Sequence, residues 1–301
     1  MKFKLRRYVL YYLARCLAFL VYIMPLSAAM ALADAIGLLA FLTARKYAGI
    51  TLENLRSVFG REKTEKEIQA IARRVFKNIA KNAVELVRFP KISESNIDDI
   101  ITMEGSEILD REFSKGKGII IITAHIGNWE MMAITLRIKN YPGVAVGKRI
   151  YFHKYDEYLN SLRRHHDVHI VYRDESPRKI LKILKSNRIV GIVADQDVDS
   201  VEGVFVNFMG RRAYTPSGPA VLAKVTGAPL VPVVVIRDGR KHRLIVSEPI
   251  ELADTGNKEA DVVTNTQRWS DVLEAYIRKY PDQWVWMHRR WKTKESVVSS
   301  P

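Results

Sequence analysis

The residues best suited to chemistry lie in the stretch TAHIGNWE, residues 123–130. The imidazole of His125 is followed by a short polar turn, and the carboxylate of Glu130 comes five positions later. A carboxylate bonded to one imidazole nitrogen fixes the tautomer and leaves the other nitrogen free to act as a base. We therefore predict that His125 is a general base and that Glu130 orients it.

This pairing requires a change of backbone direction between the two residues. Within one helix, side chains five positions apart point about 140° away from each other. If His125 lies in a turn and Asn128 caps a helix that begins near Trp129, Glu130 falls in the first helical turn and can reach back. The spacing alone also fits a structural histidine, and two ligands without a third do not indicate a zinc site.

The elements around this stretch alternate between strands and helices. The isoleucine run at 118–123 shows no apolar–polar alternation, which is typical of a central strand buried on both faces. Further strands are expected at 144–147, 168–172, 189–194, 229–236 and 243–247, with helices at 128–139, 155–165, 177–186 and 216–226. The pattern predicts an α/β fold, with a mixed, largely parallel sheet flanked by helices. His125 then lies past the carboxyl end of a strand, where open α/β sheets bind their ligands.

The N-terminal 45 residues have a different character. Four cations precede a mostly apolar stretch, and residues 16–33 carry no charge. A basic leader before an apolar run is typical of the cytoplasmic side of a membrane. Because Arg15 is costly at mid-bilayer and Pro25 breaks a helix, a helical anchor that is partly inserted or interfacial is expected at 1–45. A buried helical hairpin and a signal peptide, with Ala29 and Ala31 as an A-x-A site, are the alternatives.

The remaining chain is expected to form one catalytic domain over 46–294, followed by a frayed polar tail at 295–301. Its clearest helix, 64–89, begins with a capping box of Thr64 and Glu67 and ends before Pro90. The segment WVWMHRRWK at 284–292 mixes aromatic and cationic residues, which favours a membrane interface. We expect at least one of Trp284 and Trp286 to pack in the core instead.

Composition limits the partners and the chemistry. The formal charge of the chain is +15, which favours an acidic partner such as an anionic membrane, a phosphorylated lipid or an acidic carrier protein. The basic residues are dispersed without a nucleic-acid motif, so no nucleic-acid partner is expected. Cys16 is the single cysteine of the sequence, which excludes a disulfide within the chain and makes a cysteine nucleophile improbable.

Besides Asn128, three pairs of charged residues are candidates for substrate binding. Asp195 and Asp197 follow the strand at 189–194, where they either organise the site by pairing with arginines or merely end the strand. Arginine side chains beside a helix N-terminus can bind phosphate, which is the role considered for Arg211 and Arg212 with Thr215 as the N-cap. A solvated basic pair is the alternative. The same reading applies, more weakly, to the two cations after the strand at 144–147, Lys148 and Arg149.

Several ordered motifs together resemble one family. TAHIGNWE resembles the H-x4-D/E motif of glycerolipid-type acyltransferases, whose glycerol-3-phosphate-acyltransferase-like fold is then implied. The whole chain is similar to the lipid A biosynthesis late acyltransferases of Gram-negative bacteria. The similarity rests on NLRSVFG at 54–60, GIVADQDVD at 191–199, GVFVNFMGRRAYTPSG at 203–218, GAPLVPVVV at 227–235 and DQWVWMHRRWKTK at 282–294.

The resemblance implies an O-acyltransferase at the cytoplasmic face of the inner membrane. Such an enzyme transfers a fatty acyl chain from acyl carrier protein to a hydroxyl on a hydroxyacyl chain of a Kdo-bearing lipid A precursor. His125 would be the base and Glu130 its partner, and Arg163 or Arg164 would match a family arginine near the active site. The chain lacks the Asn-Pro pair that often precedes that arginine, which leaves the details of the acceptor open.

A thioester is already activated, so the enzyme needs only to deprotonate the attacking alcohol, which contributes roughly 10²–10⁴-fold. We expect direct transfer in a ternary complex, without an acyl-enzyme, a metal or another cofactor. Backbone N–H groups near Gly127–Trp129 are the expected donors to the oxyanion. The second candidate is an acyltransferase for another envelope glycolipid, such as a phosphatidylinositol mannoside or an ornithine lipid, with acyl-CoA or acyl carrier protein as donor.

Overall fold

The computed structural model describes residues 2–175 and 177–295 and shows an α/β fold, as predicted. Within these residues, seven strands form one mixed and mostly parallel sheet in the order β1-β9-β8-β2-β5-β3-β4. The strands are β1 (Ile101–Glu104), β2 (Ile119–Thr123), β3 (Gly143–Gly147), β4 (His169–Tyr172), β5 (Ile189–Val193), β8 (Leu230–Asp238) and β9 (Lys241–Val246). All adjacent pairs are parallel except β8 and β9, which form an antiparallel hairpin.

Strand β2 lies in the middle of this sheet between β5 and β8, and all five of its residues are buried. Its isoleucines alternate between two apolar clusters, one on each face of the sheet. The continuous apolar run therefore reflects burial on both faces, as expected for a central parallel strand.

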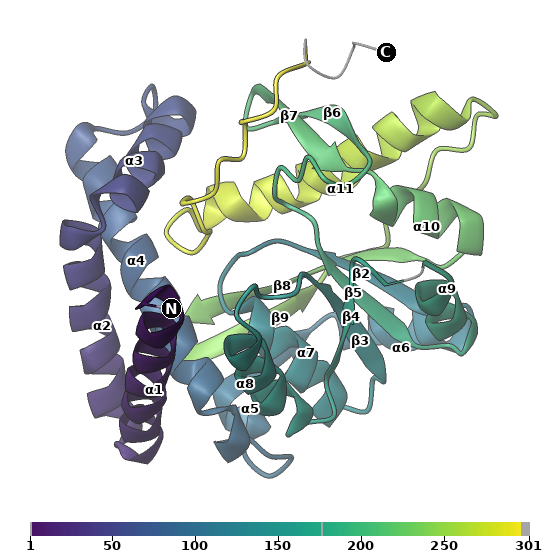
Figure 1. Ribbon diagram of the computed structural model, residues 1–301. Helices are drawn as coiled ribbons and strands as arrows, with labels where there is room; N and C mark the ends of the chain where they lie inside the picture. Colours follow the sequence, from purple (N-terminus) through teal and green to yellow (C-terminus); the bar gives the residue numbers. More distant parts are fainter. Residues whose placement is uncertain (1, 176, 296–301) are drawn as a thin grey trace.

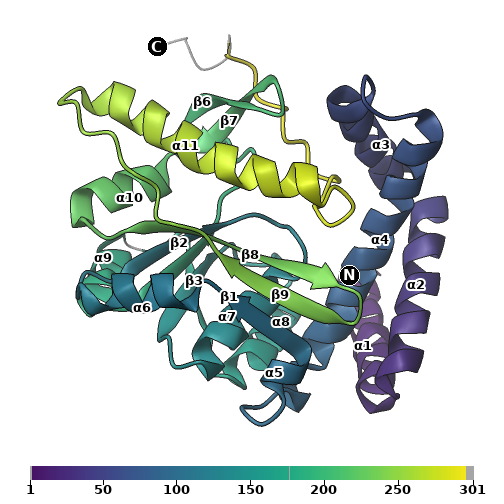
Figure 2. The ribbon, with the colours of Figure 1, turned by 180° about the vertical axis from the view of Figure 1, so that it is seen from behind.

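Helices cover both faces of the sheet (Figures 1 and 2). One face carries α5 (Ile97–Ile100), α6 (Ser106–Ser114), α7 (Trp129–Ile138) and α8 (His153–Arg164). The other carries α9 (Pro177–Lys185), α10 (Gly218–Thr226) and the long α11 (Lys258–Lys279). The helices predicted at 128–139, 155–165, 177–186 and 216–226 are confirmed as α7, α8, α9 and α10.

The N-terminal region is a group of four helices beside the sheet (Figure 1). They are α1 (Lys2–Ile23), α2 (Leu26–Thr43), α3 (Arg45–Phe59) and α4 (Glu65–Val87), followed by the short 3-10 helix η1 (Phe89–Lys91). The predicted capping box is present, because Thr64 accepts from the backbone of Glu67 while the Glu67 side chain accepts from that of Thr64. Helix α4 supports the hairpin of α1 and α2. Through contacts described below, it also supports the turn at 124–128 that carries His125, which we call the active-site turn.

The uncharged run 16–33 is not one helix, because the chain turns at Met24 and Pro25, as the proline predicted. Arg88 fixes this turn by donating to the carbonyl oxygens of Val21, Tyr22 and Met24. One helix in the described part of the chain, Leu26–Thr43, is long and apolar enough to cross a membrane. The boundary at residue 45 stays a prediction, and of the predicted tail all but Glu295 lies outside the described residues.

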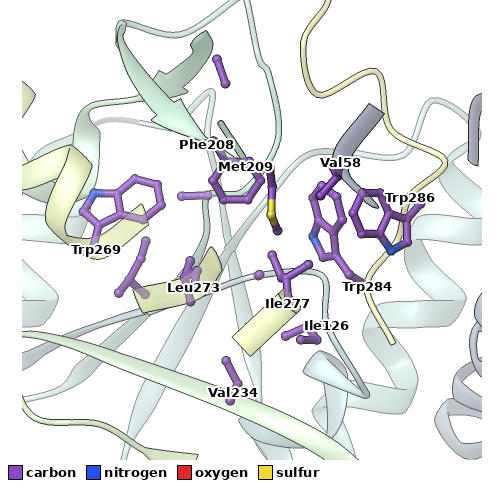
Figure 3. Packing of buried hydrophobic residues seen from close by; sticks show 14 of the residues in the cluster. Val58, Ile126, Phe208, Met209, Val234, Trp269, Leu273, Ile277, Trp284 and Trp286 are labelled. Carbon is purple, nitrogen blue, oxygen red and sulfur yellow. The ribbon is translucent and has the colours of Figure 1, made fainter. Parts of the chain in front are cut away.

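The C-terminal segment packs into the core rather than lying at a membrane interface (Figure 3). Trp284, Trp286 and Trp291 are buried, and the rings of Trp284 and Trp286 meet edge to face at 4.6 Å. The interfacial prediction is therefore wrong for these tryptophans, and the expectation of core packing is confirmed for both Trp284 and Trp286. The aromatic rings fill the space between α11 and the active-site turn, where large apolar surfaces are buried most effectively.

A second, two-stranded sheet was not predicted. Strands β6 (Gly203–Phe208) and β7 (Arg211–Pro216) form an antiparallel hairpin around a turn at Met209 and Gly210, both with positive φ. Thr215 therefore lies in β7, where its hydroxyl accepts from the buried Arg290 at 2.6 Å, and it does not cap α10 as predicted. Because Arg211 and Arg212 lie in β7, they do not flank the N-terminus of α10 as expected.

Candidate active site

His125 follows the carboxyl end of β2, and the buried carboxylate of Asp195 follows the neighbouring strand β5 (Asp195 is 1% exposed). Because Thr123 and Val193 are partners in the parallel ladder, the residues two positions further along lie side by side. The Nδ1 atom of His125 lies 2.7 Å from Oδ1 of Asp195, and its backbone N–H donates to Oδ2 at 2.9 Å. Asp195 therefore orients His125, which corrects the prediction that Glu130 does so.

The hydrogen bonds around Asp195 define the tautomer of His125. An ionised carboxylate can only accept hydrogen bonds, so the proton lies on Nδ1 and Nε2 carries the lone pair that can accept one. Burial alone would raise the pKa of Asp195. The neighbouring His125 and the hydrogen bonds from His125 and from the Trp284 indole, at 2.7 Å, outweigh burial and lower that pKa instead. The carboxylate thus stays ionised beside the imidazole of His125.

Glu130 forms a different interaction, a two-point ion pair with Arg163. The Nε and Nη2 atoms of Arg163 donate to the two oxygens of Glu130 at 2.9 and 2.6 Å. Glu130 lies in the first turn of α7 and Arg163 in the last turn of α8, so the pair ties two helices together beside the pocket. The planar guanidinium matches a carboxylate better than an imidazole does, which explains why Glu130 turns away from His125.

This geometry also distinguishes the two adjacent arginines. Burial lowers the pKa of Arg163, but Glu130 outweighs that effect and the net shift is upward. Arg163 lines the pocket, whereas Arg164 is exposed. Arg163 is therefore the site arginine of the pair.

Asn128 caps α7, as predicted, because its side chain accepts from the backbone N–H of Met131 at 3.3 Å. Its amide also donates to the buried Glu85 of α4 at 2.7 Å. Asn128 therefore holds the turn in place, and this position is structural rather than open to a substrate.

Gly127 is required by the close passage of the backbone. It has φ +55°, and a Cβ atom there would lie 1.6 Å from the carbonyl oxygen of Val235. Its N–H donates to the carbonyl of Gln283 at 3.0 Å. This N–H is consequently occupied, and the prediction that it contributes to an oxyanion hole is wrong.

Two residues that sequence reasoning missed complete the site, Gln196 and His288. The Gln196 side-chain nitrogen lies 3.2 Å from both ring nitrogens of His125 and 2.7 Å from Nε2 of His288. Burial lowers the pKa of His288 to about 4, with Asp195 opposing the shift and His125 adding to it. A neutral His288 can accept from the Gln196 amide and so fix that amide over the imidazole of His125.

The other predicted substrate-binding residues are dispersed. Within residues 2–175 and 177–295, Asp197 forms no salt bridge with an arginine and instead accepts from the backbone and hydroxyl of Thr293, both at 2.8 Å. The remaining four are cations. Lys148 lines the pocket, Arg149 pairs with Asp174, Arg211 donates to Ser57, and Arg212 pairs with Glu295. Arg211 and Arg212 lie on β7, so the predicted phosphate site at the start of α10 is not formed.

His125 lies at the wall of a pocket of about 630 Å³, a volume typical of small-molecule sites. Trp129 and Gln196 lie next to the imidazole, Glu130 and Arg163 also line the pocket, and much of the remaining lining consists of apolar residues of the sheet and α7. A base held by a buried acid at the end of an apolar pocket can deprotonate a hydroxyl next to a bound hydrocarbon chain.

Comparison with known proteins identifies the family of this chain. The chain belongs to the bacterial lipid A biosynthesis acyltransferase family, whose model matches residues 1–293. It is therefore an acyltransferase.

The similarities to individual proteins are distant but extended. The chain is 28% identical to the lipid A biosynthesis lauroyltransferase of Escherichia coli over 98% of this chain and 95% of that protein. It is 22% identical to the myristoyltransferase of the same organism, over 80% and 74%. It is 27% identical to the phosphatidylinositol mannoside acyltransferase of Mycolicibacterium smegmatis, over 69% and 67%. The chain thus spans about two thirds of that mannoside enzyme.

Proposed function

We propose that the protein transfers a fatty acyl chain from acyl carrier protein to a hydroxyl of a lipid A precursor during lipopolysaccharide biosynthesis. The observation that carries this proposal is the His125–Asp195 pair at the end of an apolar pocket. Membership of the lipid A acyltransferase family and the full-length similarity to a lauroyltransferase support the choice of acceptor.

The chemistry follows from the position of the free imidazole nitrogen. Nε2 of His125 takes the proton of the acceptor hydroxyl while its oxygen attacks the thioester carbonyl carbon. The resulting tetrahedral oxyanion collapses, the carbon–sulfur bond breaks, and the thiolate recovers the proton from the imidazolium. Asp195 stabilises that imidazolium and needs no proton itself. No acyl-enzyme is formed.

The oxyanion needs donors that are already in place. The first N–H groups of a helix have no acceptor within that helix, which makes the start of α7, four residues after His125, a suitable place for an anion. We assign this role to the N–H groups of Trp129 and Glu130. The ion pair of Glu130 with Arg163 holds this helix start against α8.

We place the enzyme at the cytoplasmic face of the inner membrane, in contact with anionic lipids. Helices α1 and α2 expose large apolar side chains, among them Leu5, Leu13, Leu39 and Leu42. An extended exposed apolar surface of this kind is typical of a membrane contact. The excess of positive charge suits both anionic lipids and an acidic carrier protein.

The experiment that tests this function uses the purified protein in detergent with defined donors and acceptors. Acyl carrier protein thioesters and acyl-CoA are each offered with a tetra-acylated, Kdo-bearing lipid A precursor or with a phosphatidylinositol mannoside, and products are weighed by mass spectrometry. The proposal expects one added chain on the lipid A precursor with the carrier-protein donor. Acylation of the mannoside alone would support the second candidate, which the similarity to mannoside acyltransferases favours.

A further inference from the structure

Strand β3 is an interior strand whose faces are both partly uncovered. It is paired on either side, with β5 and β4, yet all five of its residues are half-buried. Strand β2, two places along the same sheet, is completely buried. Because successive residues in a strand point to opposite faces, an accessible β3 means an accessible surface on both sides of the sheet.

The lining of the pocket confirms that both surfaces belong to it. Ala145 shares its register with Gly191 of β5 and with Ile121 of β2 beyond it, and Ile121 packs in the cluster beneath α7. Val144 and Val146 point the other way, against the cluster beneath α9 and α10. All five residues line the pocket. We call the two sides the α7-face groove and the α10-face groove.

The α7-face groove has small residues at its floor. Its floor is Ala145 and Gly191, its walls include Met132 and Leu136, and it extends along β3 toward Tyr141. A Cβ atom on Gly191 would meet only the Val144 carbonyl oxygen, at 3.7 Å. Five strand residues span about 13 Å at 3.3 Å per residue, which suits an extended hydrocarbon chain.

The α10-face groove reaches the surface at α10. Val144, Val146 and Ile192 form its floor, and Val221 of α10, which is 38% exposed, forms part of its rim. The exposed carboxylate of Glu202 also lines it and disfavours an anionic headgroup there. An open apolar groove of this kind admits a neutral hydrocarbon chain from the side.

We propose that these grooves hold two different hydrocarbon chains whose ends meet at His125. The α7-face groove holds the chain of the thioester, and the α10-face groove holds the acyl chain of the acceptor that carries the reacting hydroxyl. This inference rests on the proposed function and extends it. The hydroxyl oxygen bonds to the thioester carbon, the carbon–sulfur bond breaks, and the hydroxyl proton passes through His125 to the thiolate. The product is a branched ester with one chain in each groove.

The test compares two substitutions on the same helix and one on the floor of the other groove. Val221→Trp fills the α10-face groove from its rim, and Val225→Trp, at a position 70% exposed and outside the pocket lining, is the matched control. Gly191→Val narrows the α7-face groove. Val221→Trp should raise the KM for the hydroxyacyl-bearing acceptor about tenfold or more, without changing the preference among donor chain lengths.

Gly191→Val should instead shift the donor preference toward shorter chains and leave the acceptor KM unchanged, and Val225→Trp should match the wild type. An unchanged acceptor KM in Val221→Trp, or an altered donor preference there, would overturn the assignment.

A binding measurement separates this inference from the proposed function. Native mass spectrometry with methyl 3-hydroxytetradecanoate and a non-reactive thioether analogue of the donor should show both ligands bound at once to the wild type. Val221→Trp should lose the hydroxy ester and keep the analogue. If the wild type binds both ligands but transfers nothing to the lipid A precursor, the proposed acceptor is wrong, while the assignment of two chain-binding grooves is supported. If the wild type binds only one ligand at a time, the assignment of one hydrocarbon chain to each groove is wrong.

Discussion

Asp195 holds the imidazole of His125 through a side-chain contact at 2.7 Å and supports the same turn through the backbone N–H at 2.9 Å. Glu130, the partner predicted from spacing, is instead bound by Arg163. The prediction failed because the sequence shows that two strands exist but not that they are neighbours. Once β2 and β5 are paired, the acid of the ADQD motif lies beside the histidine. Asp195 itself was a candidate, but either with an arginine as its partner or as a residue that merely ends the strand.

The two acids can be separated by their effect on the pH dependence of the rate. Asp195→Asn should lower kcat about 10²–10⁴-fold, because the amide stabilises neither the correct tautomer nor the imidazolium. It should also move the acid limb of the pH–rate profile to lower pH. Glu130→Gln should leave that limb in place, because Glu130 acts through Arg163. If the acid limb of the pH–rate profile moved in Glu130→Gln and stayed in place in Asp195→Asn, Glu130 rather than Asp195 would be the partner of His125.

His288 should make the folded protein less stable in mild acid. Burial lowers its pKa from 6.5 to about 4, so between these values the unfolded chain binds a proton that the folded chain does not. Above pH 6.5, His288 does not lower the free energy of unfolding. As the pH falls toward 4, it lowers the free energy of unfolding by at most about 3 kcal/mol. Asp195, whose pKa is lowered, loses its contribution only below about pH 3.8.

Denaturant unfolding in detergent at pH 7 and pH 4.5 measures this effect, with His288→Gln as the comparison. The wild type should lose more stability between the two pH values than the variant does. Equal losses would show that His288 is not the group responsible.

At the scale of the elements, helix α4 reaches the active-site turn through one buried carboxylate. Glu85 accepts from Asn128 at 2.7 Å, from two nitrogens of Arg237 at 2.6 and 2.7 Å, and from His242 at 2.9 Å. Burial would raise its pKa, but His242 and Arg237 outweigh burial and lower it to about 2. The network fixes β8, β9 and the cap of α7 to the helix that carries the N-terminal hairpin.

Glu85→Gln should therefore lower the free energy of unfolding by about 3 kcal/mol or more, because it leaves Arg237 buried without its counter-charge. Glu65→Gln is the matched control on the same helix, since Glu65 forms an exposed pair with Arg56. Urea unfolding of both variants at pH 7 is the measurement. A loss in Glu85→Gln no larger than in Glu65→Gln would exclude the network as a stabilising feature.

Elements with a strong local signal were predictable and those without one were not. The capping box and the uninterrupted isoleucine run predicted α4 and β2, because caps and continuous burial act over a few residues. The β6–β7 hairpin was missed although its turn, Met209–Gly210, carried a glycine signal. The arginines of β7 were consequently placed at the start of a helix, where they do not lie.

At the scale of the whole molecule, helix α1 exposes apolar side chains such as Leu13 on one face and packs against α8 with another. Tyr11 of α1 packs edge to face on Phe152 and Tyr155 near the start of α8, with ring centroids 6.2 and 5.3 Å apart. Helix α8 also supplies Arg163 to the site. Helix α1 is therefore joined to the helix that carries one of the pocket-lining arginines.

Leu13→Glu, on the exposed face of α1, should weaken binding to vesicles of phosphatidylethanolamine and phosphatidylglycerol several-fold, because a charge replaces an apolar contact. Val263→Glu, at an exposed position of α11, should not. Vesicle co-sedimentation measures both, with activity on detergent-dispersed substrate as the control for folding. Equal binding by the two variants would show that α1 is not the membrane contact.

The most direct test of the central claim is a single-turnover reaction followed by mass spectrometry of both lipid and intact protein. Wild-type protein mixed with acyl carrier protein thioester and lipid A precursor should form the acylated lipid with no acyl adduct on the protein at any time. His125→Ala should fold normally and form product at least about 10²-fold more slowly. A protein-bound acyl group that forms and decays as fast as product appears, or a His125→Ala variant that keeps the wild-type rate, would contradict direct transfer by this base.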